Sequence, residues 1–251
     1  MYSTFYCTHS LGPIIHATGL RPVSVIGIES TKNERNMRRG SKSGQFAIEM
    51  VTLENGGIIK SVHGGLYKDS YWYCMYGSKG YMECTREILD DLPPYAGCHR
   101  AHTYELHVNC DAFPGDYGKP IIEHYYPDRG LEDKAQGYDH GGGDFYSMWH
   151  FVEKILGNPK ADTIDVYEAL DMFLPGKFAY MSILNGSVPT EIPNFREKSV
   201  RDQWRNDTSC TDPHVAGDML LPTRKDGTPK IDDEVYATMK KRWEESVPLD
   251  Y

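Results

Sequence analysis

Short hydrophobic segments typical of β-strands occupy the first half of the chain. From Arg21 to about Ile122, runs rich in valine, isoleucine and aromatic residues alternate with glycine, asparagine and proline. Such runs, bounded by residues that favour turns, are typical of strands. The clearest runs are residues 23–28, 46–51, 58–62, 71–75 and 104–108.

Two glycine-containing segments indicate turns between these strands. Residues 54–57 read Glu-Asn-Gly-Gly and supply the positive φ angles that a tight hairpin needs. Residues 76–81, Tyr-Gly-Ser-Lys-Gly-Tyr, form a second expected turn. Because short connections join antiparallel neighbours, the strands are expected to form largely a meander.

Helical periodicity replaces the strand pattern after Asp144. Hydrophobic residues recur every three or four positions as far as Leu156, and a Gly-Asn-Pro sequence at 157–159 ends the pattern. A second helix is expected to begin at Asp165, whose side chain would cap it, and to end at Asn-Gly, residues 185–186.

Pro175 interrupts the second predicted helix. Because proline lacks the backbone N–H and clashes with the preceding turn, we expect a kink near residues 171–174 or two helices meeting there. Strands first and helices later predict an α/β (α+β) fold that combines an antiparallel sheet with helices.

The last part of the chain is polar and irregular. After Phe195, hydrophobic periodicity returns only at residues 232–243, where acidic residues begin an amphipathic helix. We therefore expect one domain over residues 1–205 and a polar tail with a terminal helix over residues 206–251.

Composition narrows the classes of partner. The 36 acidic and 27 basic residues give a formal charge of -9, whereas proteins that bind phosphate backbones carry basic surfaces, so nucleic acid is not expected. No apolar run approaches the roughly 20 residues that cross a bilayer, so no membrane association is expected. The N-terminus lacks an export signal, which predicts a cytoplasmic protein with reduced cysteines.

Residues 6–13 resemble a motif of the Gfo/Idh/MocA family of oxidoreductases. They read Tyr-Cys-Thr-His-Ser-Leu-Gly-Pro, and only Cys7 and Ser10 depart from the Tyr-Pro-Thr-His-Gly-Leu-Gly-Pro motif of the NAD-dependent α-N-acetylgalactosaminidase branch. Later segments are similar to the same family in the same order, so the resemblance covers most of residues 2–205. These segments are residues 140–144, 165–170, 182–186 and 192–195.

The resemblance implies a C-terminal, substrate-binding domain with a large, open, mostly antiparallel sheet. Helices would pack on one face of this sheet, and the other face would line a sugar site or meet another subunit. The family also has a preceding dinucleotide-binding domain with a glycine-rich turn and a Glu-Lys-Pro segment that carries a catalytic lysine. Neither motif is found: the glycines at 141–143 have the wrong spacing, and Gly118-Lys119-Pro120 lies deep in the predicted sheet. NAD(P) is therefore expected only if a partner or a missing N-terminal domain supplies its site, and no cofactor is expected on this chain alone.

His9 and Tyr6 are the candidate catalytic residues. An imidazole titrates near neutral pH, and a phenol three residues earlier would share its helical face if the segment is helical. In the redox glycosidases that the resemblance indicates, carbon 3 of the sugar is oxidised, the glycosidic substituent is eliminated, water adds and the hydride returns. His9 and Tyr6 would serve the proton steps. The alternative is that His9 only caps or packs the opening helix.

His140 and Asp144 are the candidate substrate-binding residues. They flank a glycine run that lets the backbone approach a ligand, and a helix that begins at Asp144 would direct free N–H groups to that space. The alternative is that Asp144 is the helix N-cap and the glycines form a tight turn. Both interpretations can hold together.

Other clusters carry weaker signals. Cys98, His99, His102, His107 and Cys110 form the densest group of potential metal ligands, but their spacing fits no zinc pattern, so no metal site is expected. The aromatic residues at 71–73 and 124–126 are expected to pack in the sheet, although sugars also stack on exposed rings.

Three functions are consistent with the sequence. The first is the substrate-binding half of a carbohydrate-directed NAD(P)-dependent oxidoreductase or redox glycosidase, with a glycoside substrate, a Rossmann-domain subunit as candidate partner, and a homo-oligomeric state. The second is a stand-alone lyase, hydrolase or isomerase that acts on an oxidised sugar through His9 and Tyr6. The third is a non-catalytic assembly domain whose sheet face meets a partner chain.

Overall fold

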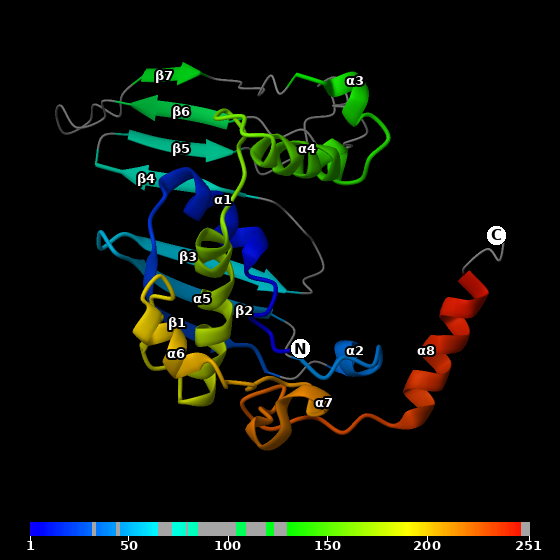
Figure 1. The fold of residues 1–251 in the computed structure, drawn as a ribbon. Helices are drawn as coiled ribbons and strands as arrows, with labels where there is room; N and C mark the ends of the chain where they lie inside the picture. The colour runs from blue at the N-terminus through cyan, green and yellow to red at the C-terminus, as the bar shows by residue number, and fades with distance from the viewer. Residues whose placement is uncertain are drawn as a thin grey trace. The chain divides into compact units, whose positions relative to one another are not determined.

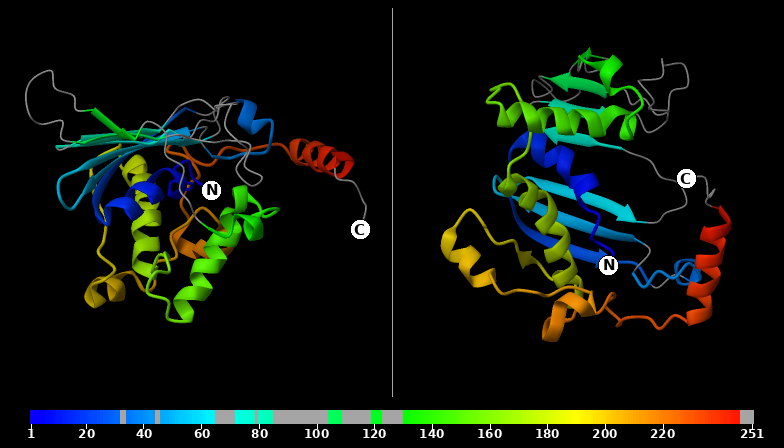
Figure 2. Two further views of the ribbon diagram at one scale, coloured as in Figure 1. Left: turned by 90° about the horizontal axis from the view of Figure 1, so that it is seen from above. Right: turned by 45° about the vertical axis from the view of Figure 1, so that its right-hand side comes forward.

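The chain divides into two compact units in the computed structural model. Residues 1–67 and 164–251 form the first unit, and residues 68–163 form the second. Figures 1 and 2 show the elements of both. The structure describes residues 1–31, 34–43, 46–64, 72–78, 80–84, 104–108, 119–122 and 130–246. These ranges do not include several residues named in the sequence analysis, which are Tyr71, Cys98, His99, His102, Cys110, Gly118 and residues 124–126.

The first unit contains a four-stranded antiparallel sheet. Its strands β1 (Pro22–Glu29), β2 (Phe46–Leu53), β3 (Ile58–Gly64) and β8 (Thr190–Glu191) pair in the order β3-β2-β1-β8. Gly56, with a φ of 84°, lies in the tight turn between β2 and β3, as the Glu-Asn-Gly-Gly sequence predicts. Val51 lies between Val25 on β1 and Ile59 on β3, and all three are buried on one face of the sheet.

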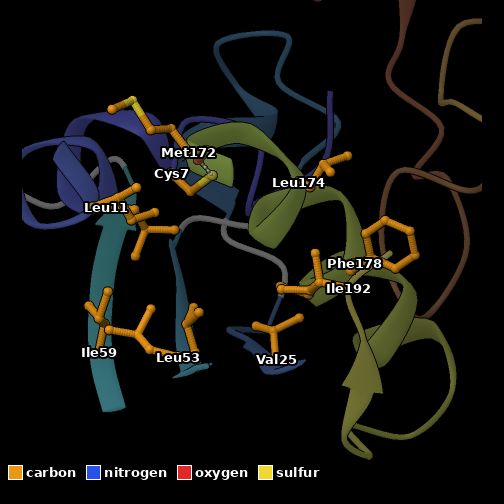
Figure 3. Close-up of a cluster of buried hydrophobic side chains, with 12 residues drawn as sticks. Cys7, Leu11, Val25, Leu53, Ile59, Met172, Leu174, Phe178 and Ile192 are labelled. Atoms are coloured by element: carbon orange, nitrogen blue, oxygen red, sulfur yellow. Dashed lines mark hydrogen bonds between the residues drawn. The ribbon is translucent and has the colours of Figure 1, made fainter. Parts of the chain in front are cut away.

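Helices α1 (Thr8–Thr18) and α5 (Val166–Leu184) pack against this sheet, and Figure 2 shows both below it in the view from above. Because strand side chains alternate between faces, every second residue of the strands meets the helices. Figure 3 shows the resulting core. It comprises Cys7, Leu11, Ile15, Val25, Val51, Leu53, Ile59, Met172, Leu174, Phe178, Ala179 and Ile192.

Helix α5 begins where the sequence predicts. Oδ1 of Asp165 accepts hydrogen bonds of 2.8 Å from the N–H groups of the second and third residues of the helix, which confirms its role as N-cap. One helix spans Pro175, so the alternative of two helices meeting there is wrong. A Cβ on Gly27 would lie 2.2 Å from the carbonyl oxygen of Ala179, so only glycine fits where β1 crosses α5.

The second unit combines another antiparallel sheet with a helical segment. Its strands β4 (Cys74–Gly77), β5 (Gly80–Cys84), β6 (Tyr104–Val108) and β7 (Lys119–Ile122) pair in that order. Its helices are α3 (Glu132–Ala135), the 3₁₀ turn η1 (His140–Gly142) and α4 (Gly143–Ile155). The turn expected at residues 76–81 joins β4 to β5, and α4 matches the helix expected at 144–156. The α/β fold with antiparallel strands and helices is therefore confirmed.

Further helices follow β8 in the first unit. They are α6 (Lys198–Trp204), α7 (Pro213–Ala216), the 3₁₀ turn η2 (Gly217–Met219) and α8 (Asp233–Ser246), while α2 (Glu34–Met37) follows β1. The amphipathic terminal helix expected from residue 232 is α8. The division into residues 1–205 and 206–251 stays a prediction. Among the described residues, no helix has the length and apolar character needed to cross a bilayer.

Candidate functional site

Tyr6 and His9 stack at the start of α1. Their ring centroids lie 4.2 Å apart and the ring planes differ by 19°. Tyr6 is 60% exposed, and His9 is exposed as well. Tyr6 belongs to the turn before the helix, whereas His9 is the second residue of α1, so a turn rather than a shared helical face brings the rings together.

Buried neighbours hold this turn in place. The Thr4 hydroxyl donates a 2.7 Å hydrogen bond to the carbonyl oxygen of Gly176 in α5. The buried Cys7 thiol lies 3.5 Å from the carbonyl oxygen of Met172. Burial, reinforced by the charge of Glu49, raises the pKa of the Cys7 thiol well above its ordinary value. Cys7 is therefore a packing residue, while the residues on either side of it reach the surface.

The exposed pair has the groups for proton transfer. An imidazole nitrogen can accept or donate a proton, and a phenol O–H can donate to a ligand oxygen. A hydroxylated ligand that reaches this turn would meet both groups at once.

His140 and Asp144 form an exposed pair in the second unit. Nδ1 of His140 lies 2.9 Å from Oδ1 of Asp144, and the side chains are 77% and 54% exposed. His140 has a φ of 54°, and the N-cap of α4 is Gly142, with a φ of 84°. A Cβ on Gly142 would lie 2.9 Å from the Cβ of Ala135, so glycine is required there.

The cap predicted at Asp144 is wrong. Because Gly142 already starts the helix, Asp144 is the second residue of α4 and points its carboxylate back to His140 instead of capping a backbone N–H. The tight glycine turn itself is confirmed. Each predicted pair is thus formed within its own unit, Tyr6 with His9 in the first and His140 with Asp144 in the second.

Residues 2–206 match the family model described as glycosyl hydrolase 109, C-terminal domain. The chain belongs to this family. A glycosyl hydrolase family 109 protein of Solibacter usitatus (strain Ellin6076) is 25% identical to the domain over 221 residues, which cover 80% of this chain and 46% of the relative.

A solved structure gives the same fold for the glycosyl hydrolase 109 domain. Aldose-aldose oxidoreductase from Caulobacter crescentus, complexed with glycerol, matches with a TM-score of 0.50 at 16% identity, over 74% of this chain and 45% of that one. The chain therefore spans about half the length of the relatives it matches. The resemblance to the C-terminal domain of Gfo/Idh/MocA oxidoreductases and their glycosidase branch is confirmed.

The sequence interpretation missed a pocket in the first unit of the glycosyl hydrolase 109 domain. It has a volume of about 620 Å³, within the range of about 300 to 1,000 Å³ that is usual for ligand pockets. Its floor is the face of α5 that carries Leu170, Phe173, Leu174 and Lys177. The spacing of these residues by three and four positions is the feature of the sequence that could have predicted this shared face. The other lining residues are Met1, Tyr2, Phe5, Phe178, Phe195, Arg201, Trp204, Asp207, Ser209, Cys210, Thr211 and Asp212.

Metal ligands do not cluster in the part of the chain that the structure describes. Within it, no group of three or more histidine, cysteine, aspartate and glutamate side chains is placed to hold a metal ion. His107, from the sequence cluster, lies on β6, while the cysteines and other histidines of that cluster lie outside the described residues.

Proposed function

We propose that this chain is the substrate-binding half of a carbohydrate-directed NAD(P)-dependent oxidoreductase or redox glycosidase. The stacked Tyr6 and His9 rings carry the proposal, because they place a phenol and an imidazole side by side on an exposed turn. Membership of the glycosyl hydrolase 109 family supports a glycoside as the substrate class.

His9 and Tyr6 would perform the proton steps of this chemistry. NAD(P), held by another domain or subunit, would supply hydride acceptance and return at carbon 3 of the sugar. His9 would take the proton from the carbon beside the resulting ketone, and Tyr6 would give its phenol proton to the oxygen that leaves with the C–O bonding electrons, and would regain a proton from the water that adds later. Addition of water to the unsaturated ketone then restores the proton at that carbon before the hydride returns.

His140 and Asp144 would contact sugar hydroxyl groups. The hydrogen-bonded pair presents a carboxylate acceptor and an imidazole on an exposed surface, and both groups suit hydroxyl ligands. Gly142 keeps the backbone beside them free of side-chain bulk. The proposed role of this pair is orientation of substrate rather than proton transfer.

The proposal also assigns partners and a location. A Rossmann-domain subunit or an N-terminal domain of the same protein would bind NAD(P), and the chain would act as a homo-oligomer in the cytoplasm. The support is that relatives of the family are about twice the length of this chain, and that the matching model describes a C-terminal domain.

Titration calorimetry with glycosides tests the binding role. The chain should bind a glycoside and not NAD(P), and His9→Ala and Tyr6→Phe should each weaken glycoside binding about tenfold, the effect of one lost hydrogen bond. His214→Ala, which removes another exposed histidine, is the control and should bind as the wild type does. Tight stoichiometric NAD(P) binding by the chain alone, or glycoside affinity independent of His9, would contradict the proposal.

A stand-alone lyase, hydrolase or isomerase is the second candidate. It is favoured by the presence of both proton-transfer groups on one turn of this chain, because elimination from an already oxidised sugar needs no cofactor. Turnover of a 3-keto-glycoside without added cofactor, abolished by His9→Ala, would support it. Activity that survives His9→Ala would show that the assigned base is wrong.

An assembly domain is the third candidate. The outer face of the first sheet exposes Ile28 on β1 and Ile58 and Val62 on β3, the two strands that flank β2, opposite the face that the helices cover. Apolar sheet faces of this kind commonly meet another protein surface. Static light scattering should then show oligomers, and a strictly monomeric chain would count against this candidate.

A further inference from the structure

The tight turn before Tyr6 is held by its two central side chains. The turn spans residues 2–5, and the N–H of its fourth residue donates a 3.2 Å hydrogen bond to the carbonyl oxygen of its first. The buried Ser3 hydroxyl donates a 2.8 Å hydrogen bond to Oε1 of Glu29, the last residue of β1. The buried Thr4 hydroxyl donates to a backbone carbonyl oxygen in α5. Because Tyr6 follows directly, the orientation of the turn sets the direction of its ring.

The two hydrogen bonds that hold the turn differ in what fixes their acceptors. The acceptor for Thr4 is backbone of α5, which the core holds in place. The acceptor for Ser3 is the end of a long side chain, and such a side chain needs further contacts to keep one rotamer. Glu29 has such a contact, because its Oε2 accepts a 3.1 Å hydrogen bond from the backbone N–H of Lys225. The carboxylate therefore joins the start of the chain to its tail.

Five consecutive tail residues, 221–225, contact the body of the first unit. This segment lies beyond residue 206, where the match to the family model ends. One of its residues adds an apolar contact, and the other four make hydrogen bonds. The contacts are Leu221 with the cluster of Tyr2, Tyr180 and Ile183, the Pro222 carbonyl oxygen with the Tyr180 hydroxyl, the Thr223 hydroxyl with the Lys42 carbonyl oxygen, Arg224 with the Ser30 carbonyl oxygen, and Lys225 with Glu29.

Arg224 brings a buried positive charge close to this carboxylate. Its side chain is 1% exposed, and its Nη2 donates a 3.3 Å hydrogen bond to the carbonyl oxygen that follows β1. Burial raises the pKa of Tyr180, the charge of Glu29 adds to the rise, and the charge of Arg224 opposes it, so both charges lie near one phenol. A buried cation offsets the charge of a buried carboxylate, which can then accept from both of its donors.

We propose that residues 221–225, the tail clasp, position the stacked Tyr6 and His9 rings through the Glu29 carboxylate. The threonine hydrogen bond holds the turn at one point, about which the turn could pivot. The serine hydrogen bond to Glu29, which the tail clasp keeps in place, holds it at a second point. Glu29 is thus a positioning residue. Its importance for chemistry rests on the proposed function, in which Tyr6 and His9 serve the proton steps.

The NMR signals of the His9 ring report the position of the turn without any ligand. The Tyr6 ring, stacked at 4.2 Å, shields the imidazole protons, so at constant pH their signals should lie upfield of those of free histidine. Ser3→Ala removes the donor to Glu29 and should move these signals at least halfway to the positions of free histidine, because the stack loosens. Ser3→Thr retains the hydroxyl and should restore the signals of the wild type.

Two further variants test the part played by the tail. Glu29→Gln has nearly the same volume but a single acceptor oxygen, so it can keep only one of the two hydrogen bonds. Arg224→Met removes the buried guanidinium and its hydrogen bond. Both should move the His9 signals in the same direction as Ser3→Ala does, and Glu29→Gln keeps the test decisive if Arg224→Met does not fold. Arg242→Met, at an exposed position of α8, is the matched control and should leave the signals unchanged.

Ser182→Ala separates positioning of the turn from stability of the fold. The Ser182 hydroxyl accepts a 3.1 Å hydrogen bond from the N–H of Gly27 and donates a 2.6 Å one to the carbonyl oxygen of Val188. Its loss should therefore lower the free energy of unfolding at least as much as Ser3→Ala does. The His9 signals should nevertheless stay at their wild-type positions. Signals that move equally in both variants would show that the serine contact is merely structural, which overturns the proposal.

Titration calorimetry with a nitrophenyl α-N-acetylgalactosaminide connects the tail clasp to the proposed chemistry. Ser3→Ala and Glu29→Gln should weaken its binding about threefold to tenfold, and Ser3→Thr should bind as the wild type does. His9 signals that do not respond to Ser3→Ala, or that respond to neither Glu29→Gln nor Arg224→Met, would overturn the tail clasp. Signals that respond as expected, with glycoside affinity independent of His9, would support the tail clasp and contradict the proposed function alone.

Discussion

The hydroxyl of Thr4 donates a 2.7 Å hydrogen bond to the backbone carbonyl of Gly176 and joins the start of the chain to the middle of α5. At this crossing the two segments are in direct contact. A Cβ on Gly176 would lie 2.4 Å from the carbonyl oxygen of Thr4 and 2.6 Å from the Cys7 sulfur. The turn that presents Tyr6 and His9 therefore depends on a glycine in α5.

Gly176→Ala should destabilise the protein by about 1 to 3 kcal/mol, because the added methyl group overpacks a contact with backbone that cannot move aside. Urea denaturation followed by circular dichroism measures the change. Gly12→Ala is the control: its Cβ would meet Met172 at an ordinary 3.5 Å, and alanine favours a helix, so it should stabilise by up to about 1 kcal/mol. Equal stability of the two variants would show that the crossing is looser than described.

Stability should fall at alkaline pH. Burial raises the pKa values of Cys7, Tyr2 and Tyr180 above their ordinary values of 9.0 and 10.0. Above those values the unfolded chain loses protons that the folded chain retains, so the free energy of unfolding decreases as pH rises. Each group adds a slope of up to about 1.4 kcal/mol per pH unit.

Tyr2→Phe isolates one of these groups. The substitution removes the phenol and preserves the ring that stacks on Tyr180 at 4.6 Å, so stability near pH 7 should change little. Between pH 10 and 11, the variant should lose less stability than the wild type, by up to about 1.4 kcal/mol per pH unit. Parallel curves for the two proteins would mean that Tyr2 titrates normally in the folded state.

Asp165→Ala should cost about 1 kcal/mol of stability, because two N–H groups in the first turn of α5 lose their acceptor. Asp165→Asn keeps the acceptor oxygen and loses only the charge near the helix N-terminus, so it should cost less. Thermal unfolding of the three proteins at one pH measures the difference. A larger cost for asparagine than for alanine would contradict the capping role.

Arg196→Met should destabilise the protein by about 1 to 2 kcal/mol. Its guanidinium lies 2.7 Å from the nearly buried Asp171 carboxylate, and that hydrogen bond raises the pKa of Arg196. The expected loss is smaller than for a fully buried pair because Arg196 is 43% exposed and water screens its charge. Arg196→Lys should restore part of the loss, and Asp171→Asn in the Arg196→Met protein should recover more, since no buried charge then lacks a partner. Denaturant titration measures all four.

Local pattern was sufficient for helices α4, α5 and α8 and for one cap. Asp165 and Asp144 both precede apolar runs, yet only Asp165 caps a helix. The difference is the glycine turn: Gly142 adopts a φ of 84° and begins α4 two residues earlier, which moves Asp144 into the first turn. A backbone angle of this kind is set by packing against Ala135, and the order of residues does not reveal it.

Long-range contacts account for the features that sequence reasoning missed. Arg224 lies in a polar stretch typical of a surface loop, but the tail packs on the end of β1 and buries it. The pocket likewise joins the first residues of the chain, one face of α5 and the residues after α6. Periodicity identifies the apolar stripe of α5 and gives no information about which distant segments border it. The family motif predicts Tyr6 and His9 as site residues, whereas a helical period does not account for their pairing.

The interruption of the first unit by the second has a consequence for synthesis on the ribosome. Strands β1, β2 and β3 emerge early, but α5 and β8, which complete their core and edge, follow only after residues 68–163. At about 5 to 20 residues per second, the early strands wait roughly 5 to 20 s for these partners. During that interval Val25, Val51 and Ile59 face water or another nascent chain. A chaperone that shields them, or slower initiation that spaces neighbouring ribosomes, should therefore raise the yield of folded protein.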